Sequence, residues 1–203
     1  MRDQEAAGDV RPPTVTLWDP FVRVFHWLLV IFVATSLLLG HFGPGDMTYH
    51  FWSGYAVAAL VVLRVIWGLV GPRPARLSAL VHHPGAVFGY LANVFRRRPS
   101  NWPGHNPIGS LSVIAMLLLL TGQVVTGLFA DPEDYINYGP LADMVEASTN
   151  QAASGWHERF SNLLLALIVL HVSVILFYRI WKREDLVSPM VKGGKEVEDH
   201  RAG

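Results

Sequence analysis

The sequence predicts an all-α integral membrane protein, a bundle of four transmembrane helices. Of its 203 residues, 51% are apolar and only 16% are charged, against roughly 25% charged in an ordinary soluble domain. Four apolar runs each approach the ~20 residues that a helix needs to cross a bilayer; they cover residues 24–40, 51–70, 108–129 and 160–181. This composition argues against a free-standing soluble enzyme and against a disordered chain.

The first apolar run is the shortest, and its helix is expected to begin about one turn earlier. It does not resemble a cleaved signal peptide, because Trp18, Asp19 and Arg23 precede it and no small-residue cleavage site follows it. Trp and Tyr residues gather at the ends of the four runs. They indicate the aromatic belts that lie at the depth of the lipid headgroups.

Lys and Arg residues are distributed unevenly among the segments that connect the runs. They lie in the N-terminal segment, in residues 71–107 and in the tail from Arg179, whereas residues 130–158 contain six acidic residues and no Lys or Arg. The positive-inside rule therefore predicts that both termini are cytoplasmic. The formal net charge is zero, so no overall field attracts nucleic acid.

The long inner connection, residues 71–107, is expected to contain a short helix on the membrane surface. Its residues 87–95 place apolar side chains at helical spacing ahead of three consecutive arginines; the alternative is a plain basic connector. We expect a flexible cytoplasmic N-terminus over residues 1–15, a transmembrane domain over 16–190 and a flexible cytoplasmic tail over 191–203.

Histidines carry the candidate chemistry of this chain. It contains no Cys, which excludes disulfides, thiolate metal sites, iron–sulfur clusters and covalently attached haem. An ionisable residue inside a membrane span indicates a functional site, and four histidines lie at or within the spans. His157 and His171 are fourteen residues apart, which is roughly 21 Å along a helix and nearly one face. Two levels result: an outer pair, His50 and His157, and an inner pair, His26 and His171.

Paired histidines at two depths predict two haem b groups, each bound by two axial imidazoles from different helices of the bundle. Gly54 follows His50 by one turn and would let a flat macrocycle approach that helix. His41 is an alternative outer ligand. It stands in a sequence that ends a helix, whereas His50 opens one, so His50 is favoured. A lone histidine would more often be a satisfied polar residue between helices.

Short motifs surround the four histidines and the ends of the runs. They are WDPFVRVFHW (18–27), YHFWSGY (49–55), RVIWG (64–68), GHNP (104–107), WHERFSN (156–162) and LH (170–171). These segments resemble the bacterial cytochrome b561 family, and within it the cytochrome b subunits associated with nickel–iron hydrogenases and with periplasmic c-type cytochromes. The resemblance covers roughly residues 15–190. It implies a bacterial inner-membrane protein with two non-covalent haem b groups, ligated by His26, His50, His157 and His171, that exchanges electrons with membrane quinone.

Three further residues have candidate roles beside these cofactors. Arg64 lies within the second run and needs a partner such as a haem propionate, unless it extends to the inner headgroups. Arg159 is expected to bind an outer propionate or to pair with Glu158. His105 is a candidate proton source for quinone, or a loop residue that caps the third span beside Asn106.

The function expected is electron transfer between membrane quinone and an outer redox partner, a c-type cytochrome or a hydrogenase. The outer loop carries Asp131, Glu133, Asp134, Asp143 and Glu146, and would steer a basic partner unless it is simply a solvated loop. Two alternatives stay open: a histidine-lined transporter or metal carrier, and a stand-alone quinone-linked oxidoreductase. His82, His83 and His200 are expected in solvated inner segments without a ligand role.

Overall fold

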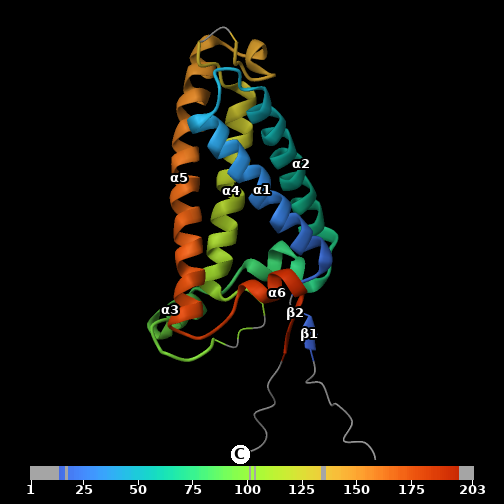
Figure 1. Cartoon of the computed structure of the whole chain (residues 1–203), viewed down its shortest axis with the longest axis vertical. Helices are drawn as coiled ribbons and strands as arrows, with labels where there is room; N and C mark the ends of the chain where they lie inside the picture. Colours follow the sequence, from blue (N-terminus) through green and yellow to red (C-terminus); the bar gives the residue numbers. More distant parts are fainter. Residues whose placement is uncertain (1–13, 17, 101, 103, 134–135, 197–203) are drawn as a thin grey trace, which may run out of the picture.

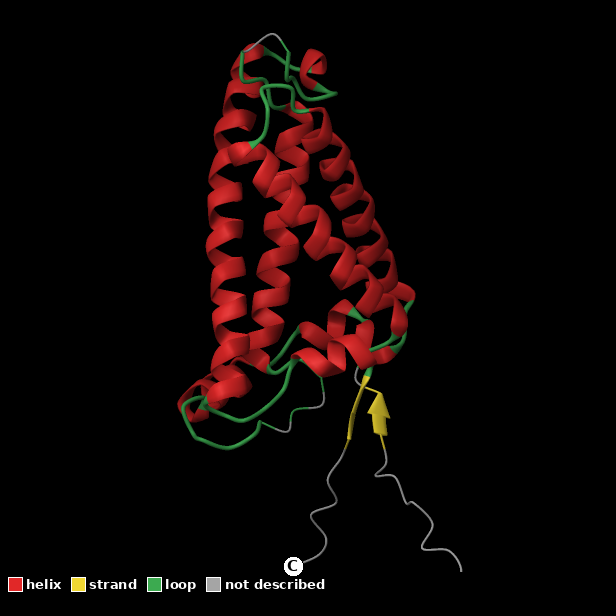
Figure 2. Ribbon diagram, viewed as in Figure 1, coloured by secondary structure: helices red, strands yellow, loops and turns green. Residues whose placement is uncertain are grey.

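Four long helices form an elongated bundle (Figure 1, Figure 2). The computed structural model describes residues 14–16, 18–100, 102, 104–133 and 136–196. Each of the four helices is long and apolar enough to cross a membrane, so the predicted all-helical membrane fold is confirmed. They are α1 (Pro20–Phe42), α2 (Thr48–Val70), α4 (Pro107–Phe129) and α5 (Ala147–Ile180).

Two of the spans begin at a capping residue followed by proline. The side chain of Asp19 accepts a hydrogen bond from the Val22 N–H at 3.0 Å, and that of Asn106 accepts one from the Gly109 N–H at 2.8 Å. The proline after each cap lacks the N–H that would otherwise be unpaired there. The first helix therefore begins one turn before its apolar run, as the sequence predicted.

The fourth span begins much earlier than its apolar run. α5 has 34 residues and starts at Ala147, thirteen residues before the run that opens at residue 160. At ~1.5 Å per residue, the 34 residues of α5 extend about 51 Å. This length is well beyond the ~30 Å of a hydrocarbon core. Hydropathy could not show the extension because its residues are mostly polar. Ser154, within it, donates to the Asp131 carbonyl at 3.0 Å and accepts from the Asp131 N–H at 2.9 Å, which fixes the preceding loop.

The core of the bundle lies at mid-height, where all four helices contribute a side chain. α1 packs against α2, α4 packs against α5, and the two hairpins meet where α2 contacts α4. Most other large apolar side chains of the spans are exposed, as expected of a surface that faces lipid. The buried core residues are Val33, Val57, Val61, Leu120 and Leu164.

The two ends of the bundle differ in charge. We call the end with the two hairpin connections, residues 43–47 and 130–146, the acidic end; it includes η3 (Ala142–Met144). The opposite, basic end carries the first and last described residues, 14–16 and 181–196, and the described part of residues 71–106 (Figure 1). The short helix predicted within residues 71–107 is confirmed there as α3. The short helices of the basic end are η1 (Arg73–Ala75), η2 (Leu77–Leu80), α3 (Pro84–Asn93) and α6 (Val187–Lys192).

A small sheet, which the sequence analysis did not foresee, joins the two ends of the chain. β1 (Thr14–Thr16) pairs antiparallel with β2 (Gly194–Glu196). Beside it, the Arg23 guanidinium of α1 donates to the Val191 carbonyl of α6 at 2.8 Å. The remainder of the two ends that were expected to be flexible, residues 1–13 and 197–203 with His200, lies outside the described residues. The domain boundaries at 15 and 190 stay predictions.

Candidate haem sites

His50 of α2 and His157 of α5 face each other near the acidic end. Their ring centroids are 6.1 Å apart and the ring planes cross at 81°. Two metal–nitrogen bonds of about 2 Å would set the coordinating nitrogens about 4 Å apart, and each ring centre lies behind its nitrogen. The observed separation therefore leaves room for one metal atom between the rings. The structure thus brings together the two residues that the sequence assigned to the outer site.

Each of these two histidines contacts the other helix of its own hairpin: His50 contacts α1, and His157 contacts α4. His50 Nδ1 lies 2.9 Å from the Ser36 carbonyl of α1, and a Cβ on Gly40 would lie 3.2 Å from His50 Cε1. The carbonyl and the glycine are four residues apart, so they lie one helical turn apart on the same face of α1. The carbonyl fixes the ring's orientation and the glycine lets the ring lie close to the helix.

His157 has the same support from α4. His157 Nδ1 lies 3.0 Å from the Gln123 carbonyl, and a Cβ on Gly127 would lie only 2.8 Å from His157 Cε1. A metal-bound histidine commonly donates its other ring N–H to a carbonyl in this way. With Nδ1–H donating, Nε2 keeps its lone pair for a metal. Sequence reasoning missed these supports, because no local pattern shows which helix face a distant imidazole will contact.

A cavity of about 670 Å³ adjoins the two imidazoles. Its volume falls in the usual 300–1,000 Å³ range of cofactor sites. Gly54 lines it, and a Cβ there would meet nothing within 4 Å. The Gln123 amide nitrogen lies 3.1 Å from His157 Nε2, while its amide oxygen is buried without a hydrogen-bond partner. Two imidazoles over an apolar cavity, with an orphaned polar atom beside them, fit a bis-histidine haem b.

His41 does not share this arrangement. Its side chain is exposed and its Nδ1 bonds to the Leu37 carbonyl of its own helix at 2.9 Å. It also borders the cavity, but it does not face the imidazole of α5 as His50 does. The geometry favours His50, and the ligand assignment stays a prediction.

His26 of α1 and His171 of α5 lie toward the basic end, and both are partly buried. The Nδ1 atom of His26 is buried and has no hydrogen-bond partner among the described residues. A buried imidazole nitrogen without a partner is costly, and a metal ion is one group that would satisfy it. The spacing of fourteen residues from His157 to His171 sets the two levels roughly 21 Å apart along α5.

His105 lies between the basic-end histidines and the N-terminal segment. Its ring centroid is 4.4 Å from that of Trp18. Burial and nearby positive charge together lower the pKa of His105 to about 4; the charged groups are Arg64, His171, His26 and His82. A histidine with this pKa is neutral at neutral pH and holds no imidazolium proton to donate. This argues against the proton source that the sequence predicted.

The arginines expected beside the cofactors differ in burial. Arg64 is only 4% exposed and donates to the Ala75 carbonyl at 2.9 Å, so the alternative that it extends to the headgroups is wrong. Its propionate role stays a prediction. Arg159 is exposed and lies over the Trp156 ring, 5.0 Å from the centroid. Asn106 caps α4 through its own side chain, a role that the sequence had also considered for His105.

The expectation that His82 lies in a solvated segment is wrong. His82 is partly buried, and its Nε2 lies 2.9 Å from the hydroxyl of Ser110, which is fully buried in α4. The two residues are 28 positions apart in the chain, so sequence spacing could not reveal the contact. His83 is exposed, and its side chain accepts a hydrogen bond from the Gly85 N–H at the start of α3.

The acidic loop exposes both charge and apolar surface. Glu133, Asp143 and Glu146 are exposed, as are Tyr138 and Met144. Asp134, which the sequence also predicted on this surface, lies outside the described residues. A surface of this kind suits a partner protein that carries complementary positive charge.

Comparison with known proteins agrees with this arrangement. Residues 17–193 match the family described as prokaryotic cytochrome b561. The chain is 26% identical to the probable Ni/Fe-hydrogenase 1 B-type cytochrome subunit of Escherichia coli (strain K12), over 85% of this chain and 86% of that protein. It is 27% and 25% identical to the probable Ni/Fe-hydrogenase B-type cytochrome subunits of Azotobacter chroococcum mcd 1 and Rhizobium leguminosarum bv. viciae, over 92% and 97% of this chain and 90% and 95% of those proteins. The chain therefore belongs to the prokaryotic cytochrome b561 family, as a multi-pass membrane b-type cytochrome that acts in electron transfer.

Proposed function

We propose that this cytochrome holds two haem b groups and carries electrons between membrane quinone and a redox partner protein at its acidic end. His50 and His157 would hold one haem, and His26 and His171 the other. The observation that carries the proposal is the pair of His50 and His157, whose ring centroids are 6.1 Å apart. His26 and His171, both partly buried, lie toward the other end of the same bundle. Bound haem iron supplies one-electron chemistry by cycling between its ferrous and ferric states.

The protein's own groups prepare the site at the acidic end. The Ser36 and Gln123 carbonyls would accept from Nδ1 of the two histidines, which orients both rings. Nε2 of His50 would then ligate directly, and Nε2 of His157 once the Gln123 amide nitrogen, 3.1 Å away, moves aside. Val33, Leu120 and Leu164 give the adjoining cavity apolar walls. Such walls keep water from the ligands and lower the local dielectric constant, which in turn tunes the redox potential.

We place quinone chemistry at the basic end, where His105 is available. A neutral His105 would donate a hydrogen bond from its ring N–H to a quinone oxygen. Arg64, a buried and permanent cation close to His105, would hold a haem propionate. Both roles use groups that the chain already buries beside His26 and His171.

The partner would dock at the acidic end, in the periplasm. The excess of Lys and Arg at the opposite end supports cytoplasmic termini in a bacterial inner membrane. The relatives are named as hydrogenase cytochrome subunits, which supports a hydrogenase as the partner. A c-type cytochrome is the alternative, because the exposed acids of the loop suit a basic surface.

A haem count with histidine variants tests the proposal. A pyridine haemochrome assay on the purified protein should give two haem b per chain. His26→Ala and His171→Ala should remove one spectral component, and His50→Ala and His157→Ala the other. His83→Ala is the matched control, because His83 is exposed and its side chain caps the start of α3. A count of one or none would reject the two-haem proposal, and stoichiometric copper or zinc would favour a metal carrier.

A further inference from the structure

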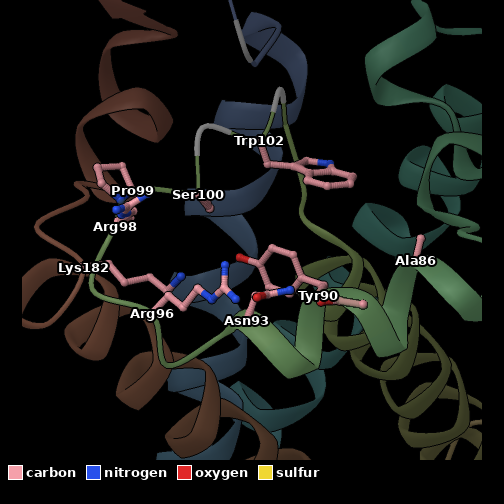
Figure 3. A pocket seen from close by; sticks show the side chains of 10 residues that line it. Ala86, Tyr90, Asn93, Arg96, Arg98, Pro99, Ser100, Trp102 and Lys182 are labelled. Carbon is pink, nitrogen blue, oxygen red and sulfur yellow. Dashed lines mark hydrogen bonds between the residues drawn. The ribbon is translucent and has the colours of Figure 1, made fainter.

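A second cavity lies at the basic end, between α3 and the end of α5 (Figure 3). It has a volume of about 400 Å³ and shares no lining residue with the cavity beside His50 and His157. None of the residues assigned above to haem or quinone lines it. The side chains that matter here are Tyr90, Asn93, Arg96, Arg98, Trp102 and Lys182.

Three of these side chains are cationic. Figure 3 shows Lys182, Arg96 and Tyr90 directed toward the same space. Lys182 is only 5% exposed, and its ammonium lies 5.9 Å and 5.3 Å from the ring centroids of Tyr90 and Tyr178. Aromatic faces compensate only part of the cost of burying a cation. An anion in the cavity would compensate the remainder.

One carboxylate lies beside the cavity, and it offsets only part of this positive charge. Glu184 accepts hydrogen bonds from the Ser100 N–H and hydroxyl, both at 2.8 Å. Against the three cations that line the cavity, one carboxylate leaves an excess of two positive charges. Arg97 does not add to it, because its guanidinium lies over the Trp181 ring, 5.4 Å from the centroid, and does not line the cavity.

Exposed apolar side chains adjoin, in the chain, the residues that line the cavity and the end of α5. Phe88, Phe95 and Ile180 are 71%, 76% and 73% exposed. The indole N–H of Trp181 donates to the Phe95 carbonyl at 2.9 Å, which joins the end of α5 to the segment after α3. Exposed apolar rings beside a basic pocket, at the end of a membrane span, are typical of the membrane interface.

We propose that this cavity binds the phosphate group of an anionic phospholipid from the leaflet at the basic end. Arg96, Arg98 and Lys182 would contact the phosphate oxygens, since guanidinium groups match phosphate geometry with two parallel hydrogen bonds. The acyl chains would lie along Phe88 and Phe95. Basic pockets between membrane helices are suited to such headgroups, and the neighbouring apolar rings favour a lipid over a free phosphate ion.

Native mass spectrometry of the full-length haem-loaded protein tests this site. Dioleoylphosphatidylglycerol and dioleoylphosphatidylcholine are titrated separately into wild type, Arg96→Gln, Lys182→Gln and Arg97→Gln. Loss of one charge-assisted hydrogen-bonding group should weaken binding of the anionic lipid by about tenfold or more. Arg97→Gln, which removes the same charge one residue away, should stay within about twofold of wild type. Unchanged haem spectra and circular dichroism establish that the variants are folded.

Three results would overturn the proposal. The first is equal binding of the neutral and the anionic lipid. The second is an equal loss of affinity in Arg97→Gln and Arg96→Gln, which would indicate diffuse surface charge. The third is tight binding of inorganic phosphate without lipid that also displaces the anionic lipid, which would make free phosphate the ligand. If Lys182→Gln fails to fold, Arg96→Gln decides alone.

Discussion

Replacing Gly127 with alanine is expected to displace His157 and cost the protein the haem of the acidic end. The new Cβ would lie 2.8 Å from Cε1 and 3.1 Å from Nδ1 of the imidazole, whereas ordinary contacts begin at 3.4 Å. The imidazole would therefore have to retreat by about 0.6 Å, the difference between 3.4 and 2.8 Å. α4 and α5 are packed together, so the side chain has to move before the backbone does.

A retreat of this size exceeds what a metal site tolerates. Metal–ligand distances stay within about 0.2 Å of their ideal values, so the shift is roughly threefold too large. The shift would also strain the hydrogen bond between His157 Nδ1 and the Gln123 carbonyl. The two atoms are already 3.0 Å apart, close to the usual upper limit of 3.2 Å for such a bond. Overpacking of this kind typically costs about 1–3 kcal/mol of stability.

The assay is a haemochrome count with a redox titration of the purified variant. We expect Gly127→Ala to lose about one haem per chain, or to show a shifted midpoint potential for one component. Gly155→Ala is the control, because it lies two residues from His157 and its Cβ would meet nothing within 4 Å; alanine there gains up to about 1 kcal/mol in helix propensity. Wild-type haem content and potentials in Gly127→Ala would refute the reasoning.

Three further predictions follow from the same geometry. His50→Ala should lower the haem content by about one per chain, whereas His41→Ala should leave it unchanged; the opposite result would make His41 the ligand. Neutralising Asp131 and Glu133 together should slow stopped-flow oxidation by a basic c-type cytochrome at low salt only, since screening over ~8 Å at physiological ionic strength removes the effect. His105 has a folded pKa of about 4 against 6.5, so the stability it contributes is present above pH 6.5 and is lost as the pH falls toward 4. Thermal unfolding of His105→Gln should show a smaller loss over that range, and an unchanged pH profile would contradict it.

Sequence alone predicted the membrane architecture because each span is long and uniformly apolar. The starts of α1 and α4 were predicted to within one turn, and Asp19 and Asn106 cap these two helices in the structure. The polar beginning of α5 was missed, because hydropathy detects a span only where it meets lipid. The pairing of β1 with β2 was missed for a different reason: each strand has three residues and the pair spans the whole chain.

The candidate site was likewise predicted only in part. Type and spacing of residues predicted the four histidines, and the structure brings His50 and His157 face to face. The environment of each residue could not be predicted, because it depends on contacts between helices far apart in sequence. His82 on Ser110 and the low pKa of His105 are two examples, and they reverse what exposure and residue type alone had suggested.

The supports of His50 and His157 also explain why α4, which contains no histidine, matters to the site. Within each hairpin, one helix supplies the imidazole and the other supplies a carbonyl and, one turn on, a glycine: Ser36 and Gly40 for His50, and Gln123 and Gly127 for His157. Each hairpin therefore orients its own ligand without help from the other. The hairpins meet where α2 contacts α4, so docking of the hairpins brings together ligands that are already preorganised. Ligand orientation is thus a local property of each hairpin, whereas ligand pairing depends on the bundle.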